Sequence, residues 1–469
     1  MLPHRAASRT PPVSPHLSLR GHHGKWTFDA ALAKTAALAT TALTVPFAHG
    51  AFAAGKLACG FWDHWVPGAN DTLTKLCKEW GDKEKVDVAI DYITSQGDKN
   101  LLTIAAEAQS HSGHDILAFP TWYAAGNADN LEPVDDIVND LAQKYGKVTA
   151  AVEYLGKQKG HWVAVPATVG SQSKPPCARI DLFKQLVGID LTQMYPAGAP
   201  PNKELADRWT WDLFLQAAVK CSKAGFPFGM PLGQTTDAVD WVGAVFASHG
   251  SVLVDQEGNV TVKSDATKQV LEWFKKIVPF LPPDVFAWDD ASNNKWLISG
   301  KGALIMNPPS AWAVANRDAP QVAEQLWTFD PPAGPKGRYD PFLPYFWGIW
   351  SFSANKPAAK SLLTFLSQRP QVEQLVAAGQ GYDLPAFAKL HDFKTWADEG
   401  PPKGTLFSYP PREDMTASIS CAPAPTNIAT QMYSQATITK MIARCTQQGE
   451  SIDQAIAWGS DELEGFMRG

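Results

Sequence analysis

The sequence predicts an α/β protein built of two lobes, and three observations support this class. Strand-like and helix-like segments alternate from Leu57 to Phe119, which is the pattern of a parallel sheet with helical crossovers. The 469 residues exceed what one hydrophobic core usually serves. The middle of the chain then becomes mostly helical. With 45% hydrophobic and 19% charged residues, the composition is that of a globular protein.

The first 53 residues differ in composition from the rest of the chain. Four basic residues precede an Ala-, Leu- and Thr-rich run: Arg5, Arg9, Arg20 and Lys25. The run ends in Ala51-Phe52-Ala53, a small-residue pattern typical of a cleavage site. We therefore expect residues 1–53 to be an export signal peptide and the mature protein to reach the periplasm. The alternative is a disordered tail with one amphipathic helix.

Charge and composition exclude several classes of function. The formal net charge is −6, and removal of residues 1–53 makes the chain more acidic. An acidic protein without basic clusters is not expected to bind nucleic acid or an anionic membrane surface. The body of the sequence also has no run of 18 or more apolar residues that would predict a membrane-spanning helix.

The cysteines carry no metal-binding or redox motif. None of the six stands in a C-x-x-C pair, so zinc-ribbon and thioredoxin-like sites are not expected: Cys59, Cys77, Cys177, Cys221, Cys421 and Cys445. Disulfides and buried free thiols both stay open as interpretations. The sequence shows no metal-ligand cluster, and we expect neither a metal nor another cofactor.

Catalytic motifs are absent or weak, so the sequence does not predict an enzyme. It has no G-x-S-x-G, H-E-x-x-H, Walker loop or complete G-x-G-x-x-G. Ser171-x-x-Lys174 matches a short motif of penicillin-interacting enzymes, but its companion motifs are missing. The adjacent pairs Asp135-Asp136 and Asp289-Asp290 are interpreted as solvated faces, because neighbouring carboxylates point apart.

The first lobe is predicted from its strands. Strands are expected at 57–62, 86–92 and 114–119, with helices at 72–80 and 99–108 between them. Ligands of open parallel sheets sit beyond the carboxyl ends of the strands. This rule places six residues at one rim: Trp62, Asp63, His64, Trp65, Thr121 and Trp122.

The rest of the chain divides between the lobes. A strand at 162–166 leads to a small polar segment, 167–174, suited to a hinge or a rim loop. Three amphipathic helices follow: 211–223, 238–250 and 265–278. The chain is expected to return to the first lobe near Ile305 and to leave it near Ser351. Lobe 1 then comprises 54–165 and 305–350, and lobe 2, mostly helical, comprises 166–304 and 351–469.

Several segments, taken in order, resemble one protein family. They are Trp162-Val163-Ala164-Val165-Pro166, Arg179 to Gly188, Thr210 to Phe214, Gly300 to Trp312 and Pro344 to Pro357. Their order is similar to that of family 1 extracellular solute-binding proteins, the maltose-binding-like receptors of ABC importers. The resemblance covers most of the chain after residue 53. The chain departs from the family at Leu213, where an acidic residue is usual, and before Gly348, where bulky Phe346-Trp347 replaces a glycine pair.

The resemblance implies a periplasmic-binding-protein-like fold, with two α/β lobes joined by two or three crossovers. It further implies a monomer that captures a small molecule, expected to be a carbohydrate, in an interlobe cleft by hinge closure. The protein would then deliver this ligand to a membrane ABC permease without covalent chemistry.

Candidate ligand-binding residues follow from what a sugar needs, namely flat apolar faces and hydrogen-bonding groups. The stacking candidates are Trp62, Trp65, Trp122, Trp312, Tyr345 and Trp347, and the resemblance adds Tyr382, in a loop that commonly faces the cleft. The hydrogen-bonding candidates are Asp63, Thr121, Gln172, Asp237 and Asn307. The alternative for each aromatic residue is that it caps the core. His64 is expected at the surface.

Two other functions stay open. A secreted carbohydrate-active enzyme could use the same aromatic residues, but it would consume its sugar where a receptor returns it unchanged. A binding protein for a non-sugar such as a polyamine would combine carboxylates with aromatics, and Asp63 with Asp237 leaves that reading open.

Overall fold

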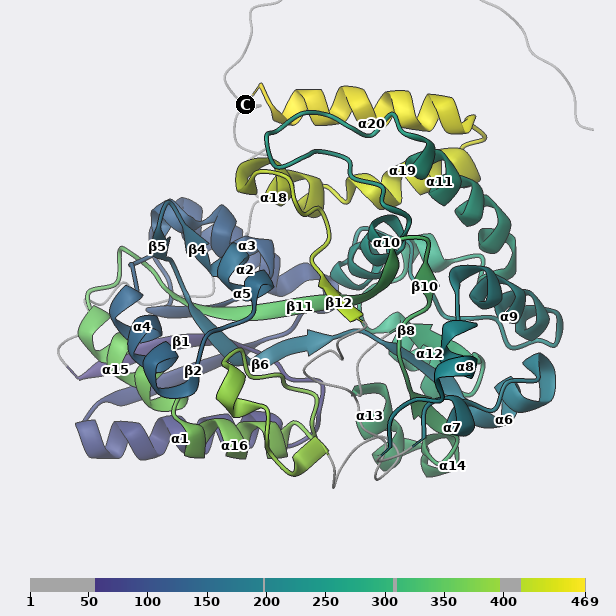
Figure 1. Cartoon of the computed structure of the whole chain (residues 1–469). Coiled ribbons are helices and arrows are strands. Elements are labelled where there is room, and N and C mark those ends of the chain that lie inside the picture. The colour runs from purple at the N-terminus through teal and green to yellow at the C-terminus, as the bar shows by residue number, and fades with distance from the viewer. Residues whose placement is uncertain (1–54, 197–198, 307–309, 397–414, 469) are drawn as a thin grey trace, which may run out of the picture. The chain divides into compact units, whose positions relative to one another are not determined.

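The computed structural model describes residues 55–196, 199–306, 310–396 and 415–468 (Figure 1). The expected signal peptide lies outside these ranges. Mixed strands and helices make the protein α/β, as predicted.

The core of the larger sheet is parallel. Strands β1 (Lys56–Trp62), β2 (Asp87–Ile93) and β3 (Ile116–Pro120) are linked by helices α1 (Ala69–Glu84) and α2 (Lys99–Ser110). Strand β1 lies between the other two and is parallel to both. The predicted strand–helix order of this region is therefore confirmed. Every residue of β3 is buried, which is typical of a strand inside a covered parallel sheet.

A long strand from much later in the chain extends this sheet. Strand β11 (Gly337–Ile349) runs antiparallel to β3 and to β6 (Val165–Ser173), and it also pairs with β10 (Ala333–Gly334) and β12 (Met415–Ser418). Seven strands result, in the order β10-β11-β3-β1-β2 with β6 and β12 on β11. Strand β11 thus brings the aromatic segment around Tyr345 beside the carboxyl end of β3.

A second, three-stranded sheet has the order β8-β7-β9, with β7 (Pro176–Arg179) antiparallel to both neighbours. Strand β8 (Leu304–Met306) was expected in the first lobe, but it pairs with β7, as does β9 (Leu326–Thr328). The return to the larger sheet is made by β11 instead. A three-residue apolar strand has no alternation that identifies its partner, so the sequence could not show this pairing.

Two helices expected in the second lobe pack on the larger sheet. Helices α15 (Lys356–Leu366) and α16 (Arg369–Ala378) contact α1, and Figure 1 shows α1 and α16 side by side below the sheet. The indole Nε1 of Trp80 on α1 donates to Ser361 Oγ on α15 at 3.2 Å. Their amphipathic pattern shows that one face is buried, but not against which sheet.

The other long helices pack on one another. Helix α10 (Thr236–His249) contacts α11 (Asp265–Ile277) and α19 (Thr437–Thr446), and α11 contacts α9 (Trp211–Lys223) and α20 (Ile452–Phe466). Hydroxyl side chains cap four of these helices at their starts, since Thr210, Thr235, Ser264 and Ser451 each accept a backbone N–H. A further helix, α18 (Thr426–Ser434), contacts α3 (Trp122–Gly126) and so packs beside the first sheet.

The remaining elements are short and connect the larger ones. They are α4 (Asp135–Tyr145), α5 (Ala150–Gly156), β4 (Lys157–Gln158), β5 (His161–Trp162), α6 (Ile180–Leu182), α7 (Leu191–Met194), α8 (Lys203–Asp207), α12 (Ser292–Ile298), α13 (Ser310–Asp318), α14 (Pro320–Ala323), η1 (Gln96–Asp98), η2 (Ala128–Asn130), η3 (Phe183–Val187), η4 (Val278–Phe280), η5 (Val285–Ala287) and η6 (Ala388–Leu390).

The cysteines resolve one alternative that the sequence left open. All six are free thiols, and five of them are buried. Within the described ranges, none of the helices is both long and apolar enough to cross a bilayer. The same ranges contain no group of three or more His, Cys, Asp or Glu placed to hold a metal ion.

Candidate ligand-binding cleft

A narrow cleft lies where the carboxyl ends of β1 and β2 meet β6, β11 and the start of α10. Twelve residues line it: Trp62, Trp65, Ser95, Asn100, Leu101, Gln172, Thr236, Asp237, Asp290, Leu343, Tyr345 and Tyr382. The free volume between them is only about 20 Å³, which is room for about one water molecule. The walls must therefore separate before a ligand of the size of a sugar ring can enter.

Aromatic rings form one wall of the cleft. Trp62, at the end of β1, stacks on Tyr382, with ring centroids 5.9 Å apart and an interplanar angle of 19°. Tyr345 on β11 and Trp65 also contact the Trp62 ring, at centroid distances of 5.4 and 6.5 Å. These four rings offer the flat apolar surface on which the C–H face of a sugar can lie.

Three polar atoms of this cleft are buried without a protein partner. Within the described residues, no hydrogen bond reaches Trp62 Nε1, Gln172 Oε1 or Tyr382 Oη. The residues are 3%, 6% and 1% exposed. An unpaired buried polar group costs about 1–3 kcal/mol, and most proteins avoid it. Together the three supply a donor, an acceptor and a hydroxyl that does both, so they can satisfy the hydroxyl groups of a ligand.

A buried histidine–aspartate pair braces the aromatic wall. His64 Nδ1 accepts the backbone N–H of Val66 at 2.8 Å, so Nε2 carries the proton and donates to Asp383 at 3.0 Å. Asp383 also accepts the backbone N–H of Gly170 on β6 at 2.8 Å. The His64 ring contacts both Trp62 and Tyr382. The expectation that His64 lies at the surface is wrong, because its partner is distant in sequence.

Charged groups form the opposite part of the cleft. Lys174, which follows β6 and is fully buried, places its Nζ 2.7 Å from Asp237 Oδ1 and 2.8 Å from Asp240 Oδ2, both on α10. Burial disfavours the ammonium form, but these two carboxylates raise the pKa of Lys174 above its usual value. Lys174 therefore stays charged and ties the end of β6 to α10.

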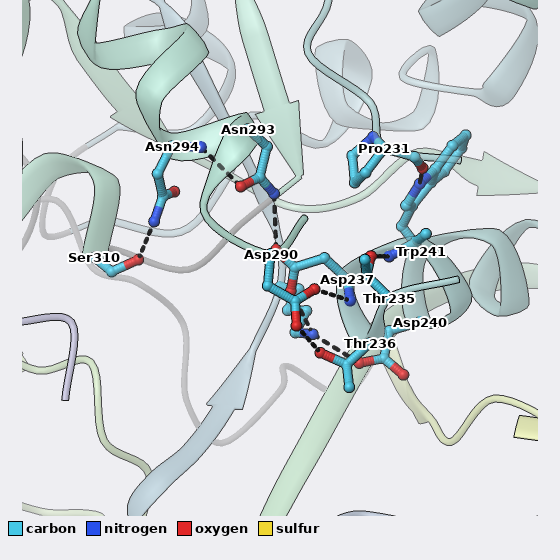
Figure 2. Close-up of polar contacts among 12 residues, drawn as sticks. Pro231, Thr235, Thr236, Asp237, Asp240, Trp241, Asp290, Asn293, Asn294 and Ser310 are labelled. Atoms are coloured by element: carbon cyan, nitrogen blue, oxygen red, sulfur yellow. Dashed lines mark hydrogen bonds and ion pairs between the residues drawn. The ribbon is translucent and has the colours of Figure 1, made fainter. Parts of the chain in front are cut away.

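Asp290 lies beside Asp237 in the same cluster (Figure 2). Its Oδ1 accepts the backbone N–H of Asp237 at 3.1 Å, and its Oδ2 accepts the Thr236 hydroxyl at 3.0 Å. Burial, and next the charge of Asp237, raise the pKa of Asp290 to about 7. Asn293 on α12 donates to Asp237 Oδ2 at 2.8 Å. The interpretation of Asp289-Asp290 as a solvated face is wrong for Asp290, which is 9% exposed.

The structure brings half of the twelve predicted site residues into this cleft. These are Trp62, Trp65, Gln172, Asp237, Tyr345 and Tyr382.

Five other predicted residues do not line the cleft, and the sixth, Asn307, lies outside the described residues. Asp63 accepts a hydrogen bond from Asn70 Nδ2 at 2.8 Å, near the start of α1. Trp122 is fully buried, and its Nε1 donates to the carbonyl of Ser420. The other three are Thr121, Trp312 and Trp347, which are also buried.

The sequence prediction did not include six residues of the cleft: Ser95, Asn100, Leu101, Thr236, Asp290 and Leu343. Ser95, Asn100 and Leu101 follow the carboxyl end of β2. The rule that placed Trp62 at the rim, applied to this second strand, would have found them.

Solved structures with this fold include several sugar-binding proteins. A maltose-bound MalE3 of T. maritima superposes with a TM-score of 0.69 at 18% identity, over 87% of this chain and 99% of that one. A sugar transporter of Arthrobacter chlorophenolicus A6 with bound laminaribiose gives 0.66 at 14% identity, over 88% and 99%. An ABC transporter solute-binding protein of Agrobacterium vitis S4 with bound D-mannitol gives 0.65 at 17%, over 88% and 98%. At these identities the likeness shows the fold.

Sequence comparison gives the family. A curated relative from Deinococcus radiodurans, named "Probable ABC transporter-binding protein", is 26% identical over 232 residues, covering 46% of this chain. The match spans about half of the relative's length, 52%. Residues 75–401 match the family described as "Bacterial extracellular solute-binding protein". The resemblance seen in the sequence motifs is thereby confirmed. This chain belongs to the bacterial extracellular solute-binding protein family and has the fold of its maltose-binding-like members.

Proposed function

We propose that this protein is the substrate-binding component of an ABC importer and that it captures a carbohydrate or polyol in the cleft. In this role it is exported to the periplasm, acts as a monomer and delivers its ligand to a membrane permease. The family supports the general role, and the solved structures with bound maltose, laminaribiose and D-mannitol support the ligand class.

One observation carries the choice of ligand class. The Trp62–Tyr382 stack lines the same cleft as the unpaired atoms Trp62 Nε1, Gln172 Oε1 and Tyr382 Oη. A sugar combines a C–H face with hydroxyl groups that both donate and accept, so one ligand would satisfy both features. A purely apolar ligand would leave all three polar atoms unpaired.

The two sheets suggest how the cleft opens. We propose one lobe around β1, β2 and β3, including α15 and α16, and a second lobe around β7, β8 and β9. The chain crosses between these sheets from β6 to β7 and from β9 to β11. The small free volume fits a closed arrangement, which a ligand would favour by contacting Trp62 on one side and Asp237 on the other.

A thermal-shift screen tests this proposal. Maltose, laminaribiose, D-mannitol, further oligosaccharides and polyols are added to the purified protein without residues 1–53. A ligand that binds only the folded state raises the melting temperature, by an amount that grows with its concentration. The proposal predicts a concentration-dependent rise with at least one carbohydrate or polyol. A complete screen without such a rise would contradict it.

The enzyme alternative has less support from the cleft. A glycosidase places two carboxyl groups on opposite sides of the scissile bond. Here Asp290 accepts a hydrogen bond from the backbone of Asp237, so these two carboxyl groups share one wall. Recovery of the bound sugar in unaltered form separates a receptor from an enzyme.

A further inference from the structure

The charged wall of the cleft contains more carboxyl groups than cations. Lys174 pairs with Asp237 and with Asp240, whereas Asp290 has neutral partners, the Thr236 hydroxyl and a backbone N–H. In the described part of the chain Asp290 forms no ion pair, although it is 9% exposed. A buried carboxylate without its own cation is costly, so the closed cleft is short of one positive charge beside Asp290.

The acceptors of the cleft match the needs of a protonated amine. An ammonium group has three donors and no acceptor, so it binds where three acceptors converge. Asp290 and Gln172 Oε1 are acceptors of this cleft, and Tyr382 Oη can act as a third. The surrounding aromatic rings also favour a cation, because their faces carry partial negative charge.

From these contacts we infer that the cleft selects ligands that carry a protonated amino group next to hydroxyls, as an amino sugar does. The carboxylate of Asp290 binds the ammonium group. This inference rests on the proposed function and narrows its ligand class. Trp62 Nε1, a donor, is left for a ligand hydroxyl. A neutral sugar would leave Asp290 either uncompensated or protonated.

Proton release gives an independent signature of such binding. Burial and the neighbouring charge of Asp237 raise the pKa of Asp290 to about 7, so a fraction of the protein carries a proton there at neutral pH. A bound ammonium stabilises the carboxylate and expels this proton. The other titratable groups facing Asp290 are Lys174, which stays charged, and four tyrosines whose pKa values burial raises: Tyr123, Tyr345, Tyr382 and Tyr433.

The experiment compares disaccharides that share one backbone. Cellobiose carries hydroxyls, di-N-acetylchitobiose carries neutral amides, and fully deacetylated chitobiose carries amines. Glucose with glucosamine makes a smaller matched pair, and spermidine is an amine without a sugar ring. Calorimetric titrations near pH 7 measure affinity. Titrations in two buffers of different ionisation enthalpy measure the net protons exchanged, and protons released by the protein are obtained after correcting for those that the partly neutral free amine takes up.

The variants separate the role of Asp290 from a general charge effect. Asp290→Asn keeps the shape and leaves its partners satisfied, because an amide can bond both Thr236 and the backbone of Asp237. Asp284→Asn removes the same charge from an exposed position of the preceding loop. We expect the amine-bearing sugar to bind wild type about 10- to 100-fold more tightly than its neutral counterpart, which is the scale of a hydrogen bond to a charged group. Asp290→Asn should abolish this ratio, and Asp284→Asn should keep it.

The outcomes distinguish this inference from the proposed function. Equal or tighter binding of the neutral sugars, with no proton release by wild type, overturns the inference and leaves the carbohydrate receptor standing. Binding of spermidine but of no sugar supports the amine site and overturns the carbohydrate role. Binding of none overturns both. Proton release by wild type keeps the test decisive even if Asp290→Asn does not fold.

Discussion

Replacing Lys174 with methionine would leave Asp237 and Asp240 buried together without the cation they share. Methionine keeps most of the length and the apolar part of the side chain, so the change removes mainly the charge. Lys174 is fully buried, and its Nζ lies 2.7 and 2.8 Å from the two carboxylates. Asp237 and Asp240 are themselves only 6% and 2% exposed, so solvent can compensate little of the lost charge.

Removing one partner of a buried ion pair costs about 3–5 kcal/mol, because a buried charge is left unpaired. A free energy of unfolding of about 5–15 kcal/mol is usual, so Lys174→Met should remove a large part of it at pH 7. Burial already raises the pKa of Asp240 in the native protein. Without Lys174 this carboxyl group will take up a proton more readily, so the penalty applies in full above its raised pKa, shrinks as the pH falls below it, and is lost only near the ordinary pKa of 3.8.

The assay is urea denaturation followed by circular dichroism at pH 5 and pH 7. Lys203→Met is the matched control, since its ion pair with Asp207 has side chains 84% and 60% exposed and should contribute less than about 1 kcal/mol. Adding Asp240→Asn to Lys174→Met should recover part of the loss, because it removes one of the unpaired charges. A Lys174→Met protein within about 1 kcal/mol of wild type at pH 7 would show that Asp237 and Asp240 do not depend on the charge of Lys174.

Three further changes test the cleft and the sheet. Tyr382→Phe should weaken ligand binding about 3- to 10-fold without loss of stability, since the Tyr382 hydroxyl has no protein partner within the described residues. The control Tyr154→Phe loses a hydrogen bond to the Ala424 carbonyl, so it should lower stability and leave ligand binding unchanged. Gly170→Ala and Gly160→Ala place alanine at φ values of +89° and +87°, which costs each about 1–2 kcal/mol in thermal unfolding. At Gly170 the new Cβ would also lie 2.8 Å from the Tyr345 ring, so that variant should lose more stability than Gly160→Ala and should be the one that also loses affinity in calorimetry. Burial raises the pKa of Asp340 from 3.8 to about 7, so the unfolded chain loses this proton first and stability declines as the pH rises from about 4 to 7. Asp340→Asn should flatten that decline in urea titrations and gain on the order of 4 kcal/mol above pH 7, and an unchanged slope would argue against an ionisable buried Asp340.

The sequence was sufficient for the parallel core of the larger sheet. Alternating strand and helix patterns are local, and right-handed crossovers leave few topologies, so β1, β2 and β3 could be placed. The partners of β8 and of the helices α15 and α16 could not be predicted. Each has a buried face, but hydrophobic burial is not directional and does not state which surface covers it.

The candidate site was predictable where a backbone rule places side chains. Trp62 is the last residue of β1, at its carboxyl end, and lies in the cleft, as the rule for parallel sheets requires. Trp347 lies two residues beyond Tyr345 on β11, about 6.6 Å further along the strand, and pairs with Ala118 inside the sheet. The position along β11 therefore decides that Tyr345 lines the cleft and that Trp347, another aromatic residue, lies in the core.

Polar contacts between residues far apart in the chain could not be predicted from the sequence. His64 finds Asp383, and Lys174 finds Asp237 and Asp240, across large separations in the chain. Neither pair has a spacing that a motif would show. These buried polar contacts of the cleft were therefore the part of the site that the sequence could not predict.

Native mass spectrometry of the protein, with a carbohydrate identified by the thermal screen, shows directly whether the cleft holds a sugar and returns it unchanged. We expect a complex of one ligand per chain, weakened in Tyr382→Phe, from which denaturation releases the ligand with its mass and linkage unchanged. Conversion of the ligand into a product would contradict a receptor. Binding as tight as that of wild type by both single variants, Tyr382→Phe and Trp62→Ala, would contradict a ligand held in this cleft.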